Sequence, residues 1–179
     1  MIILFKNIFI LLLYFSFTCC YIDNKTSNEA YKVYPSEEIK NFSLNYTDSG
    51  RLVFKIISPI AIYYDKKEEF SDFPNGLTLS LYNYNGKVVS TINSYYARLY
   101  DNNTKVELSD SVVLVNQNNE KLLTEYITWD IESEILYTNE SVTIITGNEI
   151  IHGEGFVTKN KFQTYEIKNI RGIINIDND

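Results

Sequence analysis

Residues 77–89 read LTLSLYNYNGKVV, and this stretch decides the fold class of the 179-residue chain. Leucines alternate with polar residues over positions 77–81, which is the spacing of a strand with one buried face. Asn85-Gly86 follows, and this dipeptide is typical of a two-residue hairpin turn. Val88-Val89 then begins a return strand. The stretch therefore predicts a β-hairpin.

The same pattern continues on both sides, from Phe42 to Ile176, as short alternating segments separated by turn residues. Turn signals that recur every 8–12 residues are typical of all-β domains. We interpret the charged stretch Lys66–Phe73, which ends at Pro74-Asn75-Gly76, as a loop or a single helical turn. The other turns are expected at Thr47–Gly50, Asp101–Asn103, Asn116–Asn119, Glu132-Ser133, Gly147-Asn148 and Lys159-Asn160.

A weak internal repeat relates VELSDSVVLV at 106–115 to ILYTNESVTI at 135–144, with one residue inserted at an expected turn. A spacing of about 30 residues predicts stacked hairpins, each of which buries its face on the next. Chance similarity between β-hairpins is the alternative explanation.

The composition favours a binding or structural protein over an enzyme. The formal net charge is −7 and no basic cluster is larger than Lys66-Lys67, so nucleic acid is not expected as a partner. The only histidine is His152, which cannot form a transition-metal site alone. Glu132 and Glu134 flank a turn, where solvated carboxylates are common. We expect no metal and no cofactor.

Residues 1–20 read MIILFKNIFILLLYFSFTCC and have the layout of an export signal: one cation, an apolar run, then small residues. The run is shorter than the roughly 20 apolar residues of a spanning helix. An uncleaved N-terminal anchor is the alternative. Residues 17–20, FTCC, resemble a bacterial lipobox with Cys20 as the lipidated residue, or Cys19 as the less favoured alternative. The two cysteines could instead merely end the apolar segment or pair with another chain.

These observations predict three parts of the chain. Residues 1–19 form a lipoprotein signal peptide, residues 20–40 form a polar tether, and residues 41–179 form the folded domain.

An ordered series of segments resembles the LptC family of lipopolysaccharide export proteins. The series consists of EFSDFPNGLTLSLYN (69–83), YYARLY (95–100), LTEYITWD (123–130), ILYT (135–138), SVTI (141–144) and GEGF (153–156). It covers roughly residues 66–176, and the match is closest to lipoprotein-type members of the family. Many members have an uncleaved transmembrane helix, whereas this N-terminus has the appearance of a lipidated one.

The resemblance implies an antiparallel β-jelly-roll of stacked hairpins, similar to LptA and open at both edges. It also implies a periplasmic protein anchored to the inner membrane of a Gram-negative bacterium. Such a protein receives lipopolysaccharide from the transmembrane subunits of the ABC exporter. It passes the acyl chains to LptA by edge-to-edge docking and changes nothing covalently.

Under this resemblance, apolar residues at inward positions would line a groove for acyl chains. Without it, each of them is an ordinary core residue. Strand alternation suggests inward positions for Leu79, Leu81, Ala97, Leu99, Val113, Val115, Ile127, Trp129, Ile144 and Phe156.

The last strand carries Ile173, Ile174 and Ile176, and only Arg171 and Asp177 place charges beside it. An apolar edge strand can add a partner strand. We expect this edge to dock LptA and the Phe42–Ser58 end to face the transporter. A strand tucked back into its own sheet is the alternative.

Two other functions remain open. A surface-exposed carbohydrate-binding β-sandwich lipoprotein would use the abundant tyrosines as stacking platforms for sugars. A glycosidase would need two carboxylates across a cleft, and the sequence does not single out such a pair.

Overall fold

The computed structural model describes residues 34–65, 69–100, 104–159 and 161–175. Every regular element in these ranges is a β-strand, and all pairings are antiparallel, which confirms the predicted all-β class. The strands are β1 (Glu37–Asp48), β2 (Arg51–Tyr64), β3 (Phe70–Phe73), β4 (Leu77–Tyr82), β5 (Val88–Ser94), β6 (Tyr96–Tyr100), β7 (Lys105–Asn116), β8 (Lys121–Asp130), β9 (Ile135–Ile145), β10 (Glu149–Lys159) and β11 (Thr164–Asn175).

All strands belong to one sheet, which folds over because two strands change partners along their length. The first part of β2 pairs with β4 and its last part pairs with β3. The first part of β7 pairs with β6 and its last part pairs with β5. Since β3 also pairs with β6, and β4 with β5, two layers result.

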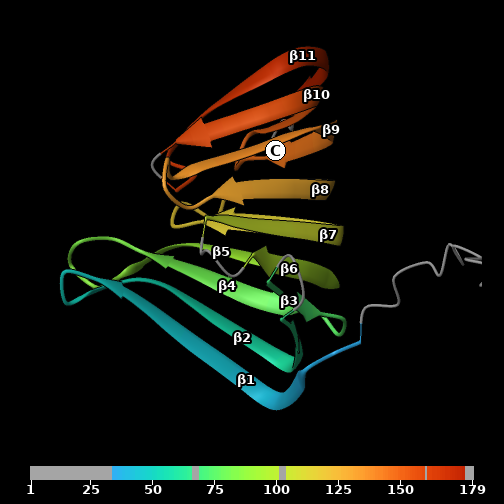
Figure 1. Ribbon diagram of the computed structural model, residues 1–179. Coiled ribbons are helices and arrows are strands. Elements are labelled where there is room, and N and C mark those ends of the chain that lie inside the picture. Colours follow the sequence, from blue (N-terminus) through green and yellow to red (C-terminus); the bar gives the residue numbers. More distant parts are fainter. Residues whose placement is uncertain (1–33, 66–68, 101–103, 160, 176–179) are drawn as a thin grey trace, which may run out of the picture. The chain divides into compact units, whose positions relative to one another are not determined.

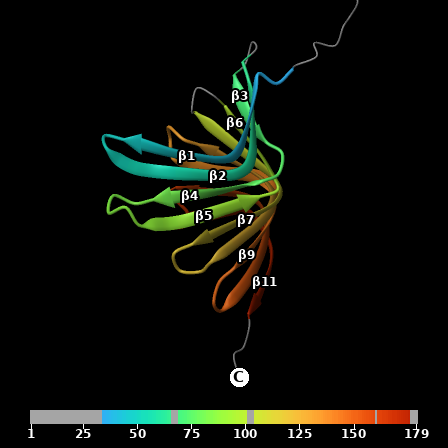
Figure 2. The same cartoon turned by 90° about the horizontal axis from the view of Figure 1, so that it is seen from below.

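We call the layer that contains β4 and β5 the first layer, and the layer that contains β3 and β6 the second layer. The longer strands contribute one part to each layer. Figure 1 shows them stacked from β1 to β11. In Figure 2, β4 and β5 extend to one side of a common bend while β3 and β6 rise from it. We call this bend the crease.

The crease is built from backbone irregularities in the long strands. Asn41, Asp110, Ser111 and Gly155 all have positive φ, and each lies where a strand crosses between the layers. Such β-bulges bend a strand and can shift its alternation. The apolar face of each strand therefore turns inward on both sides of the crease.

The internal repeat corresponds to β7 and β9, but its middle residues are not turns. The segments SDS in β7 and NES in β9 lie at the crease, within continuous strands. The hairpins that stack are instead β7–β8 and β9–β10, whose turns lie at the expected positions near 117–120 and 146–148.

Two boundaries differ from the sequence-based expectation. Strand β3 (Phe70–Phe73) lies in the stretch that was expected to be a loop, because it bridges β2 and β6 across the second layer. Strand β1 begins at Glu37, inside the segment expected to be a tether. The predicted turn at Asp101–Asn103 lies outside the described residues.

Close backbone contacts at Gly76 stabilise the bend of the sheet at the crease. Ser58 Oγ donates to the carbonyl oxygens of Gly76, at 2.7 Å, and Ile60, at 2.8 Å. Gly76 has a φ of +77°, and a Cβ at this position would lie 2.4 Å from the carbonyl oxygen of Ser94. Only glycine fits here, because both the φ and the close approach exclude a side chain.

We predict that Gly76→Ala destabilises the fold more than Gly86→Ala does. Gly86 has a similar φ of +72°, but nothing lies within 4 Å of its would-be Cβ. Gly86→Ala should therefore cost only the left-handed strain of about 1–2 kcal/mol. Gly76→Ala should cost about 1–3 kcal/mol more because of the clash. Urea unfolding followed by the fluorescence of Trp129, the only tryptophan, measures both. Equal losses would show that the contact at Gly76 is unimportant.

Candidate functional site

An apolar ladder crosses the first layer on the side that faces the second layer. Its members are cross-strand neighbours in successive strands from β1 to β10, and Ile173 of β11 continues the register beside Ile151. The ladder consists of Leu44, Ile56, Leu79, Ile92, Leu114, Leu122, Ile144 and Ile151. The two end members are half-buried and the six between them are 0 % exposed. The ladder thus runs from the edge strand β1 to β10, which lies next to the other edge strand, β11.

The second layer faces this ladder with a shorter apolar set. Its cross-strand neighbours include Leu99, Val106, Trp129 and Leu136, in that order. Trp129 meets Phe54 of the first layer edge to face, with ring centroids 5.0 Å apart. Aromatic contacts of this kind hold the two layers together. We call the space between the two ladders the interior.

Most of the predicted groove residues line this interior. Leu79, Leu81, Ala97, Leu99, Ile127, Trp129, Ile144 and Phe156 are all buried in the cluster between the layers.

The inward placement of Val113 and Val115 is wrong. Both are half-buried on the outer face of β7, whereas Val112 and Leu114 point inward. The run Val112–Val115 is apolar throughout, so alternation within it does not show which residues face inward. Val106 and Leu108, earlier in β7, are buried and even-numbered, and the buried residues of the run are even-numbered too.

The interior is filled by the protein's own side chains rather than open. Trp129 is 1 % exposed and most members of the cluster are 0 % exposed. A few polar side chains lie among them, notably Ser90 and Asn116, which are 1 % and 5 % exposed. Among the described residues, Trp129 Nε1 is a buried donor without a hydrogen-bond partner. An unpaired buried donor is costly, by about 1–3 kcal/mol.

The turn between β10 and β11 also lies in the interior, which the sequence did not predict. Phe162 is 0 % exposed and packs on Phe156 and Tyr165, with ring centroids 5.8 and 5.3 Å away. The sequence predicts only a turn near Lys159-Asn160. An aromatic residue within a turn was the one signal that could have suggested burial.

Both edges of the sheet are unpaired within the described chain: β1 pairs only with β2, and β11 only with β10. Of the residues expected at the docking edge, Ile173 and Ile174 lie in β11 opposite Ile151 and Ile150. Ile176 lies outside the described residues. So do Cys19, Cys20 and the expected signal and anchor. The described part of the chain holds no helix suited to crossing a membrane.

The outer faces of the two layers differ in polarity. On the second layer, Arg98 forms a two-pronged ion pair with Asp72, at 2.7 and 3.0 Å. Nearby, Lys105 pairs with Glu107 at 2.7 Å. Burial opposes ionisation of Glu107, but hydrogen bonds from Lys105 and Tyr100 outweigh it and lower the pKa of Glu107. The outer face of the first layer mixes exposed apolar side chains, such as Ile57 and Leu123, with exposed polar ones such as Asn93.

The turn carboxylates and His152 lie at the surface. Asp130 accepts hydrogen bonds from the backbone nitrogen and Oγ of Ser133, and these bonds lower the pKa of Asp130. Glu132 and Glu134 are exposed. The exposed His152 contacts Thr143 Oγ1 through Nδ1, at 3.0 Å. Asp130 thus stabilises its own turn, whereas a carboxylate oxygen of Glu134 lies 3.9 Å from Lys161 Nζ.

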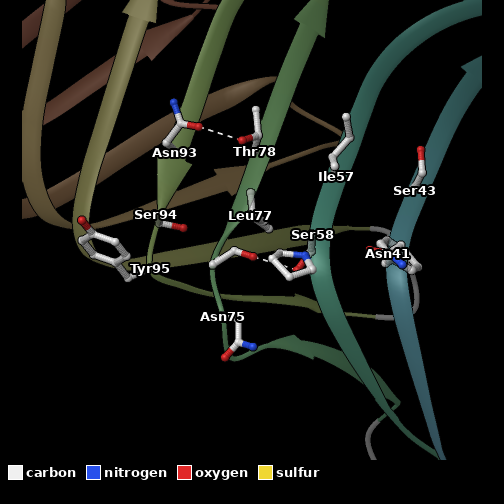
Figure 3. Close-up of a pocket in the computed structure, with 13 residues that line it drawn as sticks. Asn41, Ser43, Ile57, Ser58, Asn75, Leu77, Thr78, Asn93, Ser94 and Tyr95 are labelled. Carbon is white, nitrogen blue, oxygen red and sulfur yellow. Dashed lines mark hydrogen bonds between the residues drawn. The ribbon is translucent and has the colours of Figure 1, made fainter.

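A separate cavity of about 580 Å³ lies beside the crease, where β2 and β4 stop pairing. Figure 3 shows Asn93 and Thr78, joined by a 2.8 Å hydrogen bond, together with Asn75 and Tyr95. Ser94 Oγ is buried here without a partner among the described residues. The residues that line this cavity are all uncharged. They are Asn41, Phe42, Ser43, Ile57, Ser58, Pro59, Asn75, Gly76, Leu77, Thr78, Asn93, Ser94 and Tyr95.

The chain matches one protein family and no curated sequence. The family is described as "Lipopolysaccharide-assembly, LptC-related", and its profile covers residues 1–175. A search of the curated proteins gave no match. The family match extends over nearly the whole chain and agrees with the single antiparallel sheet. It implies a role in lipopolysaccharide transport with other Lpt components, on the periplasmic side of the inner membrane. The chain belongs to the LptC family.

Proposed function

We propose that the chain transports lipopolysaccharide by holding its acyl chains in the interior between the two layers. The observation that carries this proposal is the apolar ladder, because it extends across the sheet from β1 to β10 without a charged member. A ladder that spans nearly the whole sheet can take up a ligand near one edge and release it near the other.

Apolar burial is the force that suits this ligand. The chain has a net charge of −7, and lipopolysaccharide is anionic, so long-range attraction does not favour binding. Each buried methylene contributes about 0.8 kcal/mol, so several acyl chains supply ample affinity. Because the interior is filled, the two layers have to part before the chains can enter.

The free edges suit docking to other Lpt proteins. An unpaired strand offers backbone donors and acceptors to a partner strand. We assign the edge strand β11 as the docking surface for LptA, and the edge strand β1 as the docking surface for the transmembrane subunits of the ABC exporter. The lipid anchor on Cys20, or on Cys19, would hold the protein at the inner membrane and belongs to the same proposal.

We expect a photo-crosslinker at Leu114 to capture lipopolysaccharide, and one at Val115 to capture little. The two residues are neighbours on β7, but Leu114 faces the interior and Val115 the outer face. Benzophenone side chains would replace each residue in turn in cells, and adducts would be detected on blots with an antibody to lipopolysaccharide. Circular dichroism would confirm that each variant is folded. Adducts at both positions, or at Val115 alone, would contradict the interior as the site.

A second expectation concerns the edge. Deletion of residues 171–179 removes the part of β11 that pairs with residues 149–152. We expect this variant to lose co-purification with LptA but to remain attached to the membrane. Deletion of residues 176–179 leaves β11 in place and should preserve both properties. Undiminished co-purification of the longer deletion would refute the assignment of β11 to LptA.

A second candidate function, carbohydrate binding, draws support from the cavity beside the crease. Its volume lies within the roughly 300–1,000 Å³ of typical ligand pockets. Asparagine amides and hydroxyl groups can bond sugar hydroxyls, and Tyr95 is 73 % exposed, as a stacking platform would be. The absence of charge in its lining favours an uncharged saccharide over a phosphorylated one.

Carbohydrate binding predicts that Tyr95→Ala lowers glycan retention on an oligosaccharide array, because the stacking face is lost. Tyr84→Ala is the matched control, since Tyr84 is 86 % exposed and does not line the cavity. If both variants bind as the unaltered protein does, this candidate function fails.

A further inference from the structure

The turn between β10 and β11 is held in the interior by the far layer. Lys161 and Phe162 have φ values of +59° and +68°. A bulky residue rarely adopts such a φ, and it persists only when the surroundings enforce it. Phe162 is nevertheless 0 % exposed. Contacts with the surrounding residues therefore hold the turn in this strained conformation.

Three hydrogen bonds join the turn to the first layer, and Lys161 Nζ also lies 3.9 Å from a carboxylate oxygen of Glu134, in the turn between β8 and β9. Ser90 Oγ, on β5, donates to the carbonyl oxygen of Lys161. Asn116 Nδ2, on β7, donates to the carbonyl oxygen of Phe162 at 3.2 Å. Lys161 Nζ donates to the carbonyl oxygen of Tyr82, at the end of β4, at 2.6 Å. The end of β10 lies in the second layer, opposite β9 and β8, so the turn ties one layer to the other.

Ser90 and Asn116 are two of the eight buried polar residues in the described part of the chain. They are 1 % and 5 % exposed, and buried donors of this kind need acceptors. In this structure the acceptors include two backbone carbonyl groups beside a buried aromatic side chain. An acyl chain offers the same pairing, since an apolar chain follows an ester or amide carbonyl.

We propose that the Lys161–Phe162 turn is an internal substitute for an acyl ligand. Phe162 occupies the place of the chain, and the two carbonyl groups occupy the place of its ester or amide groups. When an acylated ligand enters, the turn leaves, and Ser90 and Asn116 bind the ligand's carbonyl oxygens. Release of the turn is then also what lets the layers part. The inference rests on the interior as the ligand site.

This arrangement gives the interior a selectivity beyond apolarity. Asn116 Nδ2 also donates to Glu120 Oε2 at 2.6 Å, so departure of the turn frees the Ser90 hydroxyl and one of the two N–H groups of Asn116. A ligand with a carbonyl group satisfies these donors, whereas a plain alkyl chain does not. Buried unpaired donors discriminate strongly against a ligand that lacks the matching group.

The test uses the full chain with the double substitution Ser90→Cys and Lys161→Cys. The chain has no cysteine beyond residue 20, so mass spectrometry of the bridged peptide identifies the new disulfide unambiguously. The bridge should form readily when the turn is docked, and no bridge without ligand would overturn the proposal. The probes are sucrose monolaurate, an acyl ester, and dodecyl maltoside, which has the same chain length and a disaccharide but no carbonyl group.

Sucrose monolaurate should slow the bridging reaction about tenfold, because it shifts the turn to the displaced state. Dodecyl maltoside should slow it less, because the double variant keeps Asn116, although not the Ser90 hydroxyl, as a donor to the ester carbonyl. Equal slowing by both probes would overturn the carbonyl recognition, and no slowing by either would overturn the displacement of the turn. Each single cysteine variant controls for loss of the native side chain.

A second measurement links the turn to lipopolysaccharide. With a photo-crosslinker at Ile144, oxidation of the double variant should reduce lipopolysaccharide adducts about tenfold, and reduction of the bridge should restore them. Unchanged adducts after oxidation would show that the turn does not close the interior. If the protein with the crosslinker at Ile144 and with native Ser90 and Lys161 also gives no adducts, the proposed transport function fails. The detergent experiment would still decide the role of the turn.

Discussion

The structure depends on one constraint: strands long enough to serve two layers must turn an apolar face inward on both sides of the crease. Some strands do this by a shift in alternation at the crease, whereas β7 keeps its even-numbered residues inward on both sides. In β8 the buried positions change parity at the crease, from Leu122 and Thr124 to Ile127 and Trp129. In β10 the same shift occurs at Gly155, which has a φ of +77°. The bulges at the crease are thus what convert a single sheet into two facing layers with one apolar interior.

This constraint also explains why function and stability compete in the interior. The residues that would bind acyl chains are the same residues that hold the layers together, such as Trp129 against Phe54 at 5.0 Å. A domain of this kind needs a filled interior when no ligand is present, because an empty apolar space would forfeit its packing. The inward-folded turn with Phe162 helps to fill that space from within the chain. Its hydrogen bonds with Ser90 and Asn116 hold the turn in one defined position.

The sequence predicted the class of the fold well, because its signals are local. The alternation of Leu77, Leu79 and Leu81 is present, and a turn lies at the expected place. This turn spans Asn83–Gly86 within a longer loop, however, and is not a two-residue turn at Asn85-Gly86. What the sequence could not reveal depends on contacts between distant strands. The phase of Val113 and Val115 is ambiguous in a continuous apolar run, and β3 exists because β2 and β6 pair with it. The burial of Phe162 depends on Ser90 and Asn116, which are remote in sequence. The family resemblance supplied the transport role, which no single residue could indicate.

The most direct test of the account uses Trp129, the only tryptophan in the chain, which lies 1 % exposed in the interior. Lipopolysaccharide with bromine atoms on its acyl chains would be added to the unaltered protein, and tryptophan fluorescence would be recorded. Bromine quenches fluorescence only at close contact, so the account predicts saturable quenching by brominated acyl chains and little quenching by lipopolysaccharide brominated on its sugars. Binding without quenching by the acyl-labelled ligand would contradict the account, because the acyl chains would then lie outside the interior.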